Sequence, residues 1–384
     1  MKVVIIGAGV VGLSIAVNLA RRGAEVTVIE RNSAGSGTSS TSYAWVNANN
    51  KEPQSYFDLN LAGMRAHAEI AGSGAWLQQT GHVELATDDA HRFELEERTA
   101  RLQQMGYPAE HISASRAREL VPDLLIPDDC DSIVSFASES CCYPLPFVGH
   151  LLREAALEGV TILTGLNVER LEARGHGANV ILEDGTVLAA NHVVSAAGRW
   201  TNQITALAGV PPVMFEFTEP GDVTVGYLTI TNPLPTSLTG LVTSPRLNVR
   251  PAGGGRLMLQ ALDLDVSADP TCVPDTSSVI ATEFIDRLRG VLQNTAEAEI
   301  VELQVGQRAM PRDGLSVIGP AESAPWLYLV ATHSGITLAP LLGSGVAGEI
   351  FGDSEPLFAD FRPSRLAGDK VVNVPEAPRH PGEQ

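Results

Sequence analysis

The sequence of 384 residues contains very little lysine and cysteine. Only three of its 26 basic residues are lysines (Lys2, Lys51 and Lys370), so few positions could supply a catalytic lysine. The four cysteines form no Cys-x-x-Cys pair and have no run of histidine ligands beside them. We therefore expect no metal site and no disulfide framework, and this cysteine usage fits a cytoplasmic location.

Positive charge is scarce as well, because 45 acidic side chains bring the formal net charge to −19 at pH 7. Nucleic acids and anionic membranes bind basic surfaces, so neither is an expected partner. Beyond the first twenty residues, no segment approaches the roughly 18 uninterrupted apolar residues of a transmembrane span. The apolar start, which precedes Arg21 and Arg22, leaves a signal peptide as an alternative, but its regularly spaced glycines favour a folded domain.

The first thirty residues alternate between strand-like and helix-like patterns. Two β-branched runs predict strands over 2–6 and 24–29, and the segment between them predicts a helix over 10–22. A G-x-G-x-x-G sequence at the junction of the first strand and the helix ends at Gly12, and Glu30 closes the second strand. A glycine motif in this setting, with an acidic residue at this distance, indicates a dinucleotide-binding fold.

Each part of this motif has a physical role. Gly7 permits a tight turn, Gly9 lets the backbone approach a pyrophosphate, and Gly12 lets the helix pack closely on the strand. The N–H groups and the positive dipole end of the helix attract the phosphates. Glu30 would accept hydrogen bonds from an adenosine ribose, and none of these features distinguishes NAD from FAD.

The segment that follows favours FAD. Residues 33–42 are all small, and most of them carry hydroxyl groups. Backbone N–H groups and hydroxyls in such a run can surround a phosphate and a ribityl chain. A flexible linker is the alternative, although a linker is less expected inside a compact fold.

The rest of the chain divides into a region of mixed helices and strands and a strand-rich region. Helices are predicted over 53–80, 88–105, 113–120, 144–158, 278–292 and 333–350. Strands are predicted over 160–163, 168–171, 179–182, 187–189, 192–200, 223–231, 241–243, 247–250, 256–261, 299–309 and 326–331. Threonine, valine and proline dominate residues 211–303, which indicates a separate antiparallel sheet.

Three motifs in a fixed order point to a known family. The first is the nucleotide motif at 7–30, and the second is the strand end at 193–200, which is similar to the family pattern V-V-x-A-A-G-x-W. The third comprises 306–319 and 332–340. Together they resemble the FAD-dependent oxidoreductases of the D-amino-acid oxidase family, which includes glycine oxidase, sarcosine oxidase and D-amino-acid dehydrogenases.

The resemblance implies two domains, in agreement with the chain length and with a hydrophobic content of 44%. One is a Rossmann-like α/β domain that binds FAD, and the other is an α+β domain whose mostly antiparallel sheet covers the flavin. The FAD-binding domain is expected to be discontinuous, over residues 1–50, 141–206 and 303–366. The substrate-binding and helical cap domain is expected over 51–140 and 207–302, before a loosely ordered tail over 367–384.

FAD is expected to bind without a covalent bond, because no cysteine lies near Met310 and His67 is interpreted as a packed helical residue. The residues expected to contact the cofactor come from all three motifs and from the hydroxyl-rich segment. They are Gly7, Gly9, Val10, Val11, Gly12, Glu30, Arg31, Gly37, Thr38, Ser39, Ser40, Ala44, Trp45, Val46, Val168, Ala197, Gly198, Trp200, Arg308, Ser334, Gly335, Ile336, Thr337 and Leu338.

Four residues are expected at the substrate. Arg308 matches the family position that holds the substrate carboxylate, with a structural salt bridge as the alternative. His333 precedes the last helix and would either tune charge on the reduced flavin or simply pack. Asn248 stands where the family has a carboxylate-binding tyrosine, and Arg250 shares its strand face, so Arg250 could serve instead or be structural.

The expected reaction is oxidation of a D-amino acid or N-substituted amino acid to an imine by hydride transfer to flavin N5, followed by hydrolysis. The scarcity of lysine, with only Lys51 in a suitable segment, favours a dehydrogenase over an oxidase. Two alternatives remain: an enzyme for a specialised secondary amine, and a non-catalytic flavin-binding subunit of a larger complex. The expected partner is a small amine or amino acid, and a homo-oligomer is left open.

Overall fold

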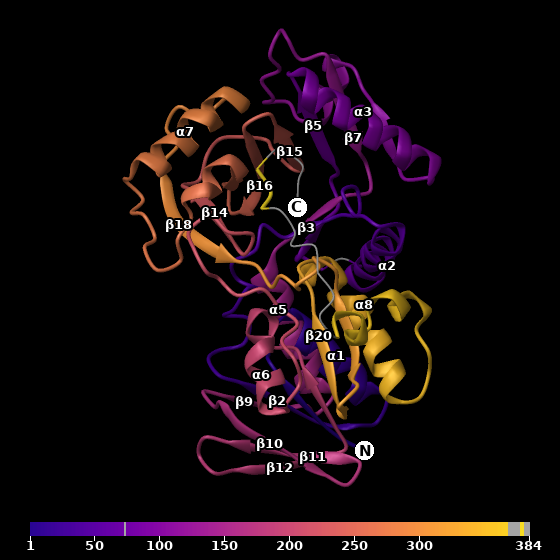
Figure 1. Ribbon diagram of the computed structural model, residues 1–384. Coiled ribbons are helices and arrows are strands. Elements are labelled where there is room, and N and C mark those ends of the chain that lie inside the picture. Colours follow the sequence, from indigo (N-terminus) through magenta and orange to yellow (C-terminus); the bar gives the residue numbers. More distant parts are fainter. Residues whose placement is uncertain (73, 368–376, 380–384) are drawn as a thin grey trace.

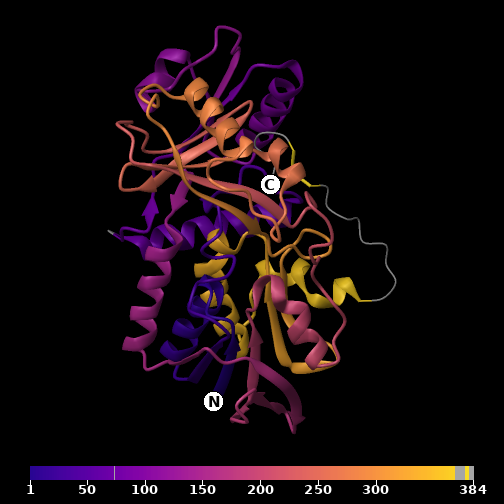
Figure 2. The same ribbon diagram turned by 90° about the vertical axis from the view of Figure 1, so that its left-hand side faces the viewer.

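The computed structural model describes residues 1–72, 74–367 and 377–379. Two large sheets lie in opposite halves of the molecule, and Figures 1 and 2 show this separation from two directions. One half contains the N-terminus, and the other contains α7 and α3 (Figure 1). The predicted class, a Rossmann-like α/β fold with a second, mostly antiparallel sheet, is confirmed.

The sheet near the N-terminus has six strands in the order β19–β20–β13–β1–β2–β9. They are β1 (Lys2–Ile6), β2 (Glu25–Glu30), β9 (Thr161–Thr164), β13 (His192–Ser195), β19 (Val317–Ala321) and β20 (Ala324–Ala331). Neighbours are parallel except β19 and β20, which are antiparallel. Val3 and Ile5 pack on one side of this sheet, and Val4 and Ile6 pack on the other, as strand alternation requires.

Both faces of this six-stranded sheet are covered. Three helices pack on one face: α1 (Val10–Arg21), α5 (Pro144–Leu157) and α8 (Gly335–Ile350). The other face carries a small sheet and a short helix: β10 (Val168–Arg174), β11 (Gly177–Leu182), β12 (Val187–Ala190) and α6 (Thr201–Leu207). Because both faces of the sheet are covered, its strands are rich in apolar residues, and all of them except β19 were predicted from the sequence.

The second large sheet has eight strands in the order β18–β14–β17–β16–β15–β5–β7–β6. They are β5 (His82–Ala86), β6 (Ala109–His111), β7 (Ser132–Phe136), β14 (Val225–Thr231), β15 (Leu241–Ser244), β16 (Leu247–Gly253), β17 (Arg256–Gln260) and β18 (Ile300–Gln307). All neighbours are antiparallel except β15 and β5. Helix α7 (Val279–Val291) packs its apolar side on one face of this sheet.

Further elements lie outside the two layers already described. Helix α2 (Gln54–Ala71) packs against α8, and a small sheet joins β3 (Trp45–Val46), β4 (Leu77–Gln78) and β8 (Ser140–Cys142). Helices α3 (Asp89–Gln104) and α4 (Ala114–Leu120) pack beside β7. The described residues also form four short 3-10 helices: η1 (Gly198–Trp200), η2 (Leu262–Ser267), η3 (Pro356–Phe361) and η4 (Pro363–Leu366).

Two local predictions need correction. The helix expected over 53–80 ends at Ala71, because Gly72 takes a left-handed backbone with φ +48° and the chain then enters β4 and β5. The strands β5, β6 and β7 were not predicted, although they complete the eight-stranded sheet. Their apolar alternation is weak, since buried positions of β5 include His82 and Glu84.

The exact domain boundaries stay a prediction. The expected loose order of the tail over 367–384 concerns residues that lie mostly outside those the structure describes. Within the described part of the chain, no helix is both long enough and apolar enough to cross a bilayer.

Candidate cofactor and substrate site

One elongated cavity connects the nucleotide motif with the eight-stranded sheet. At one end it is lined by Gly7, Gly9 and Glu30, and at the other by Leu228 and Gln260. Almost all of the predicted cofactor residues line this cavity. The exceptions are Gly12, Ser40, Val46 and Leu338.

The three motif glycines stand where the backbone has no room for a side chain. A Cβ on Gly7 would lie 2.5 Å from the Ala196 carbonyl oxygen, and its φ of +110° disfavours other residues. A Cβ on Gly12 would overlap the Gly7 carbonyl oxygen, which explains why Gly12 supports the site without lining it. A Cβ on Gly9 would lie 3.1 Å from the Ser39 hydroxyl oxygen. These glycines leave space for a dinucleotide beside the start of α1, so the residues present fit FAD.

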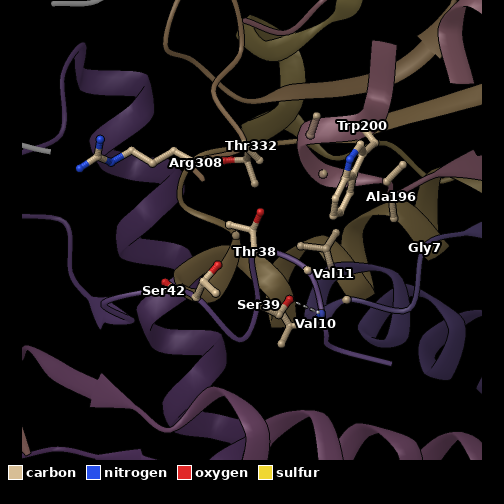
Figure 3. A pocket seen from close by; sticks show the side chains of 18 of the residues that line it. Gly7, Val10, Val11, Thr38, Ser39, Ser42, Ala196, Trp200, Arg308 and Thr332 are labelled. Carbon is tan, nitrogen blue, oxygen red and sulfur yellow. Dashed lines mark hydrogen bonds between the residues drawn. The ribbon is translucent and has the colours of Figure 1, made fainter. Parts of the chain in front are cut away.

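The hydroxyl-rich segment folds over the start of α1. The Ser39 hydroxyl accepts a hydrogen bond of 3.2 Å from the Val10 backbone N–H, drawn as a dashed line in Figure 3. Val10 and Ser39 both line the cavity, whereas the Ser40 hydroxyl donates to the Gly37 carbonyl. Because the first N–H groups of a helix have no partner within it, this end of α1 can also bind a phosphate.

Glu30 is fixed at the end of β2. Its carboxylate accepts hydrogen bonds from the backbone N–H groups of Ala8, at 3.0 Å, and Asn32, at 2.9 Å. Each carboxylate oxygen retains further acceptor capacity, as binding to ribose hydroxyls would require. Val168 lines the same cavity, at the start of β10.

Two arginines lie against the ring of Trp200, and one of them, Arg31, lines the cavity together with it. The guanidinium carbons of Arg31 and Arg199 lie 4.5 Å and 3.8 Å from the Trp200 ring centroid. Burial, together with the neighbouring Arg31 charge, lowers the pKa of Arg199 to about 10. A Cβ on Gly37 would lie 3.0 Å from the same ring. The cations therefore lie close to the phosphate-binding end of the cavity, where they complement negative charge.

The start of α8 lines the cavity with Ser334 to Thr337. Helix α2 holds this start in place, because the Tyr56 hydroxyl bonds the Ser334 hydroxyl at 2.8 Å. His67 Nε2 donates to the Ile336 carbonyl at 2.6 Å, and its ring packs 5.1 Å from that of Phe147. Burial lowers the pKa of His67 to about 4, so this histidine is neutral and does not line the cavity.

His333 lines the cavity immediately before α8. Burial lowers its pKa to about 3, and the positive charges of Lys51 and Arg308 act in the same direction. The imidazole is therefore neutral at physiological pH. It can donate or accept a hydrogen bond at the flavin, but it does not supply a positive charge there.

The remaining predicted substrate residues occupy different environments. Arg308 lines the cavity, and Figure 3 shows its side chain extending away from Gly7 and Trp200. Arg250 is 1% exposed and lies outside the cavity lining, where its guanidinium donates to the Tyr43 and Pro251 carbonyls. Asn248 is buried, bonds Gln260 at 3.3 Å and borders a second hollow.

Several cavity residues were not predicted from the sequence. Gly226, Leu228, Gln260 and Leu262 come from the eight-stranded sheet and the 3-10 helix after it. Their contribution depends on which face of each strand points at the cavity. No local motif marks that face, so only the pairing of distant strands reveals these residues.

This fold and cavity define a flavin-dependent oxidoreductase with a Rossmann-like cofactor domain. The family model described as DAO, FAD dependent oxidoreductase, matches residues 2–348, and the chain belongs to this family. Glycine oxidase of Geobacillus kaustophilus is 25% identical, over 90% of this chain and 91% of that protein. An uncharacterized oxidoreductase of Bacillus subtilis is also 25% identical, over 95% of this chain and 98% of that protein.

Solved structures support the same architecture. The crystal structure of the Geobacillus kaustophilus glycine oxidase superposes with a TM-score of 0.84 at 22% identity, over 96% of this chain and 100% of that one. L-proline dehydrogenase from P. horikoshii gives a TM-score of 0.81 at 22% identity, over 95% and 97% of the two chains. At these identities the likeness concerns the fold.

Proposed function

We propose that this flavoenzyme oxidises the carbon–nitrogen bond of an amine or amino acid to an imine, which water then hydrolyses. FAD supplies the hydride acceptor. The observation that carries the proposal is the placement of Arg308 and His333 on the same cavity as the nucleotide motif. A guanidinium beside a flavin site offers a carboxylate anchor, which amino acids require and simple alcohols do not.

The chain's own residues would position the substrate. Arg308 binds the carboxylate of the substrate. His333 lies next to the reacting groups, and because its imidazole is neutral it places no positive charge there. Leu228 and Leu262 supply an apolar wall that excludes water from the reacting carbon. The N–H groups at the start of α8 favour negative charge nearby.

FAD is proposed to be bound without a covalent link. Among the described residues, neither His67 nor any of the four cysteines lines the cavity. Denaturing the purified yellow protein in acid should therefore release the flavin into the supernatant. A flavin that stays with the precipitate would contradict this part of the proposal.

The activities named for several relatives support the substrate class. They include glycine oxidase, one component of opine oxidase, L-proline dehydrogenase and L-amino acid deaminase. The test is anaerobic mixing with a panel of D-amino acids, N-methyl amino acids and other secondary amines, followed at the flavin absorption band. Bleaching by at least one member is expected, and a flavin-loaded protein that no amine reduces would sink the proposal.

A second candidate is an amine-oxidising component of a larger enzyme. One of the subunits of opine oxidase from Agrobacterium tumefaciens is 24% identical, over 87% of this chain and 89% of that protein. Its name describes a single component of an assembly, which is the observation that favours this candidate. Purification with and without neighbouring gene products would separate the two cases. Full turnover by the isolated chain would remove this candidate.

A further inference from the structure

Arg308 is held by three acceptors behind the cavity wall. Its Nη1 donates to the carbonyls of Val223, at 3.3 Å, and Val225, and its Nη2 donates to Asp265 at 3.0 Å. A guanidinium has five N–H donors, so these contacts leave one on Nε and one on Nη2. Nε and Nη2 can share one edge of the planar group, and such an edge binds a carboxylate bidentately.

The Asp265 carboxylate uses one of its two oxygens to accept the hydrogen bond from Arg308. Its side chain is wholly buried in η2, and its other oxygen accepts the Tyr227 backbone N–H at 2.7 Å. Strand β14 makes room at Gly226, where a Cβ would lie 2.5 Å from both Arg308 Nη2 and the Asp265 carboxylate. Asp265 does not line the cavity, so it reaches a substrate only through Arg308.

The burial of this carboxylate needs a partner. A wholly buried carboxylate is costly unless it is paired and hydrogen-bonded, and Arg308 is its ion-pair partner in the structure. Burial raises the pKa of Asp265, and the Arg308 charge opposes that rise. The pair is therefore interdependent: the Arg308 charge favours the ionised form of Asp265, and Asp265 fixes the direction of Arg308.

We propose that Asp265 is a positioning residue that holds the open edge of Arg308 toward the cavity and thereby sets the affinity for carboxylate-bearing amines. The inference rests on the proposed function. It names the substrate class more narrowly, as an amine with a carboxylate close to the oxidised carbon. An amine without a carboxylate should not depend on Asp265.

The first test is Asp265→Asn in the FAD-loaded protein. Asparagine has one acceptor oxygen, so it cannot satisfy both the Tyr227 N–H and Arg308 as the carboxylate does. Calorimetry with benzoate and acetate should show at least tenfold weaker binding. KM for a carboxylate-bearing substrate should rise by a similar factor, while kcat changes less than threefold. Should this variant fail to fold, Asp265→Glu keeps the charge but shifts it by one methylene, and it should weaken benzoate binding in the same way.

Asp263→Asn is the matched control. Asp263 lies in the same 3-10 helix and also pairs with an arginine, since its carboxylate accepts from Arg287 at 2.6 Å and 2.8 Å. It has no contact with Arg308, so benzoate affinity and KM should stay at their wild-type values. If Asp263→Asn weakened benzoate binding as much as Asp265→Asn does, any change in η2 would disturb the site, and the inference would be wrong.

A double variant distinguishes positioning from general damage. In an Arg308→Gln background, adding Asp265→Asn should change benzoate affinity and KM less than twofold. Asp265 acts on the carboxylate only through the Arg308 guanidinium, which this background already lacks. A further tenfold loss in that background would overturn the inference, as would wild-type protein that binds neither benzoate nor acetate. Failure of every amine to reduce the flavin would instead reject the proposed function, and the benzoate result would be read independently of it.

Discussion

The two ends of the cavity are built in different ways. At the nucleotide end, Gly7, Val10, Glu30 and Ser39 all come from the first forty residues, and backbone atoms make many of the contacts. At the opposite end, the wall combines residues that lie far apart in the chain, such as Tyr43, Gln260 and Arg308. A common cofactor can be bound by a local motif, whereas a particular substrate requires a surface assembled by the whole fold.

This contrast also explains the two arginines that the sequence offered as anchors. Arg250 and Arg308 both lie in or next to strands of the eight-stranded sheet, and both donate to backbone carbonyls. Only Arg308 lines the cavity, while Arg250 supports the Tyr43 backbone from within the protein. Arg308 was proposed from a motif and Arg250 from the strand face that it shares with Asn248, but only the structure shows that Arg308 borders the cavity and Arg250 does not.

The largest expected effect belongs to the local motif. Gly12→Ala forces a methyl group against the Gly7 carbonyl, and we expect a loss of about 3 kcal/mol in the free energy of unfolding together with lost FAD binding. Urea denaturation and flavin titration measure both quantities. Gly149→Ala in α5 is the control, since a Cβ there meets nothing within 4 Å. Wild-type stability in Gly12→Ala would refute the close packing of α1 on β1.

The two arginines should lose different properties when they are changed to glutamine. Arg308→Gln removes charge-assisted hydrogen bonds worth about 1.5–3 kcal/mol, so KM for a carboxylate substrate should rise about 10- to 100-fold. It should also lower stability, because the buried Asp265 carboxylate loses its ion-pair partner. Arg250→Gln leaves the Tyr43 and Pro251 carbonyls without their donor, which should cost about 3 kcal/mol of stability. Steady-state kinetics and urea denaturation of both variants check this. An equal rise of KM in both variants would contradict the conclusion that only Arg308 faces the substrate.

The sequence predicted most residues that line the nucleotide end of the cavity, for a physical reason. Gly7, Gly12 and Glu30 act within a strand–helix–strand unit, so their spacing along the chain already describes their arrangement in space. Gln260 and Gly226 carry no such signal, because β14 and β17 join the cavity wall only when the eight-stranded sheet forms. The ion pair between Arg308 and Asp265 could not be predicted for the same reason, because the two residues are 43 positions apart in the sequence.

Acid should weaken the support that α2 gives to the start of α8. Unfolded histidine has a pKa of about 6.5, whereas burial lowers the pKa of His67 to about 4. The stability that depends on neutral His67 is complete above the unfolded pKa and is lost as the pH falls toward the folded one. It should amount to about 2 kcal/mol between pH 7 and pH 5.

Unfolding of His67→Gln in urea at pH 7, 6 and 5 measures this contribution. Glutamine keeps a donor for the Ile336 carbonyl but takes up no proton, so the decline with pH should become shallower by about 2 kcal/mol. His111→Gln, on the exposed end of β6, serves as the control for the substitution itself. An unchanged decline in His67→Gln would assign the acid sensitivity to other groups.

The smallest expected effect sharpens the comparison at the nucleotide end. Ser39→Ala removes the acceptor of the Val10 N–H at the start of α1, a capping contact worth about 1 kcal/mol. Because FAD phosphates can accept from the same N–H, the loss of stability should appear mainly in the flavin-free protein, and FAD affinity should stay within fivefold of wild type and not fall. Ser40→Ala, whose hydroxyl donates to Gly37 within the same segment, is the control for FAD affinity. Fluorescence titration of both variants decides whether the hydroxyls of this segment bind the cofactor directly or mainly shape the backbone that does. A loss of FAD affinity far above fivefold in Ser39→Ala alone would give that hydroxyl a direct contact with the cofactor.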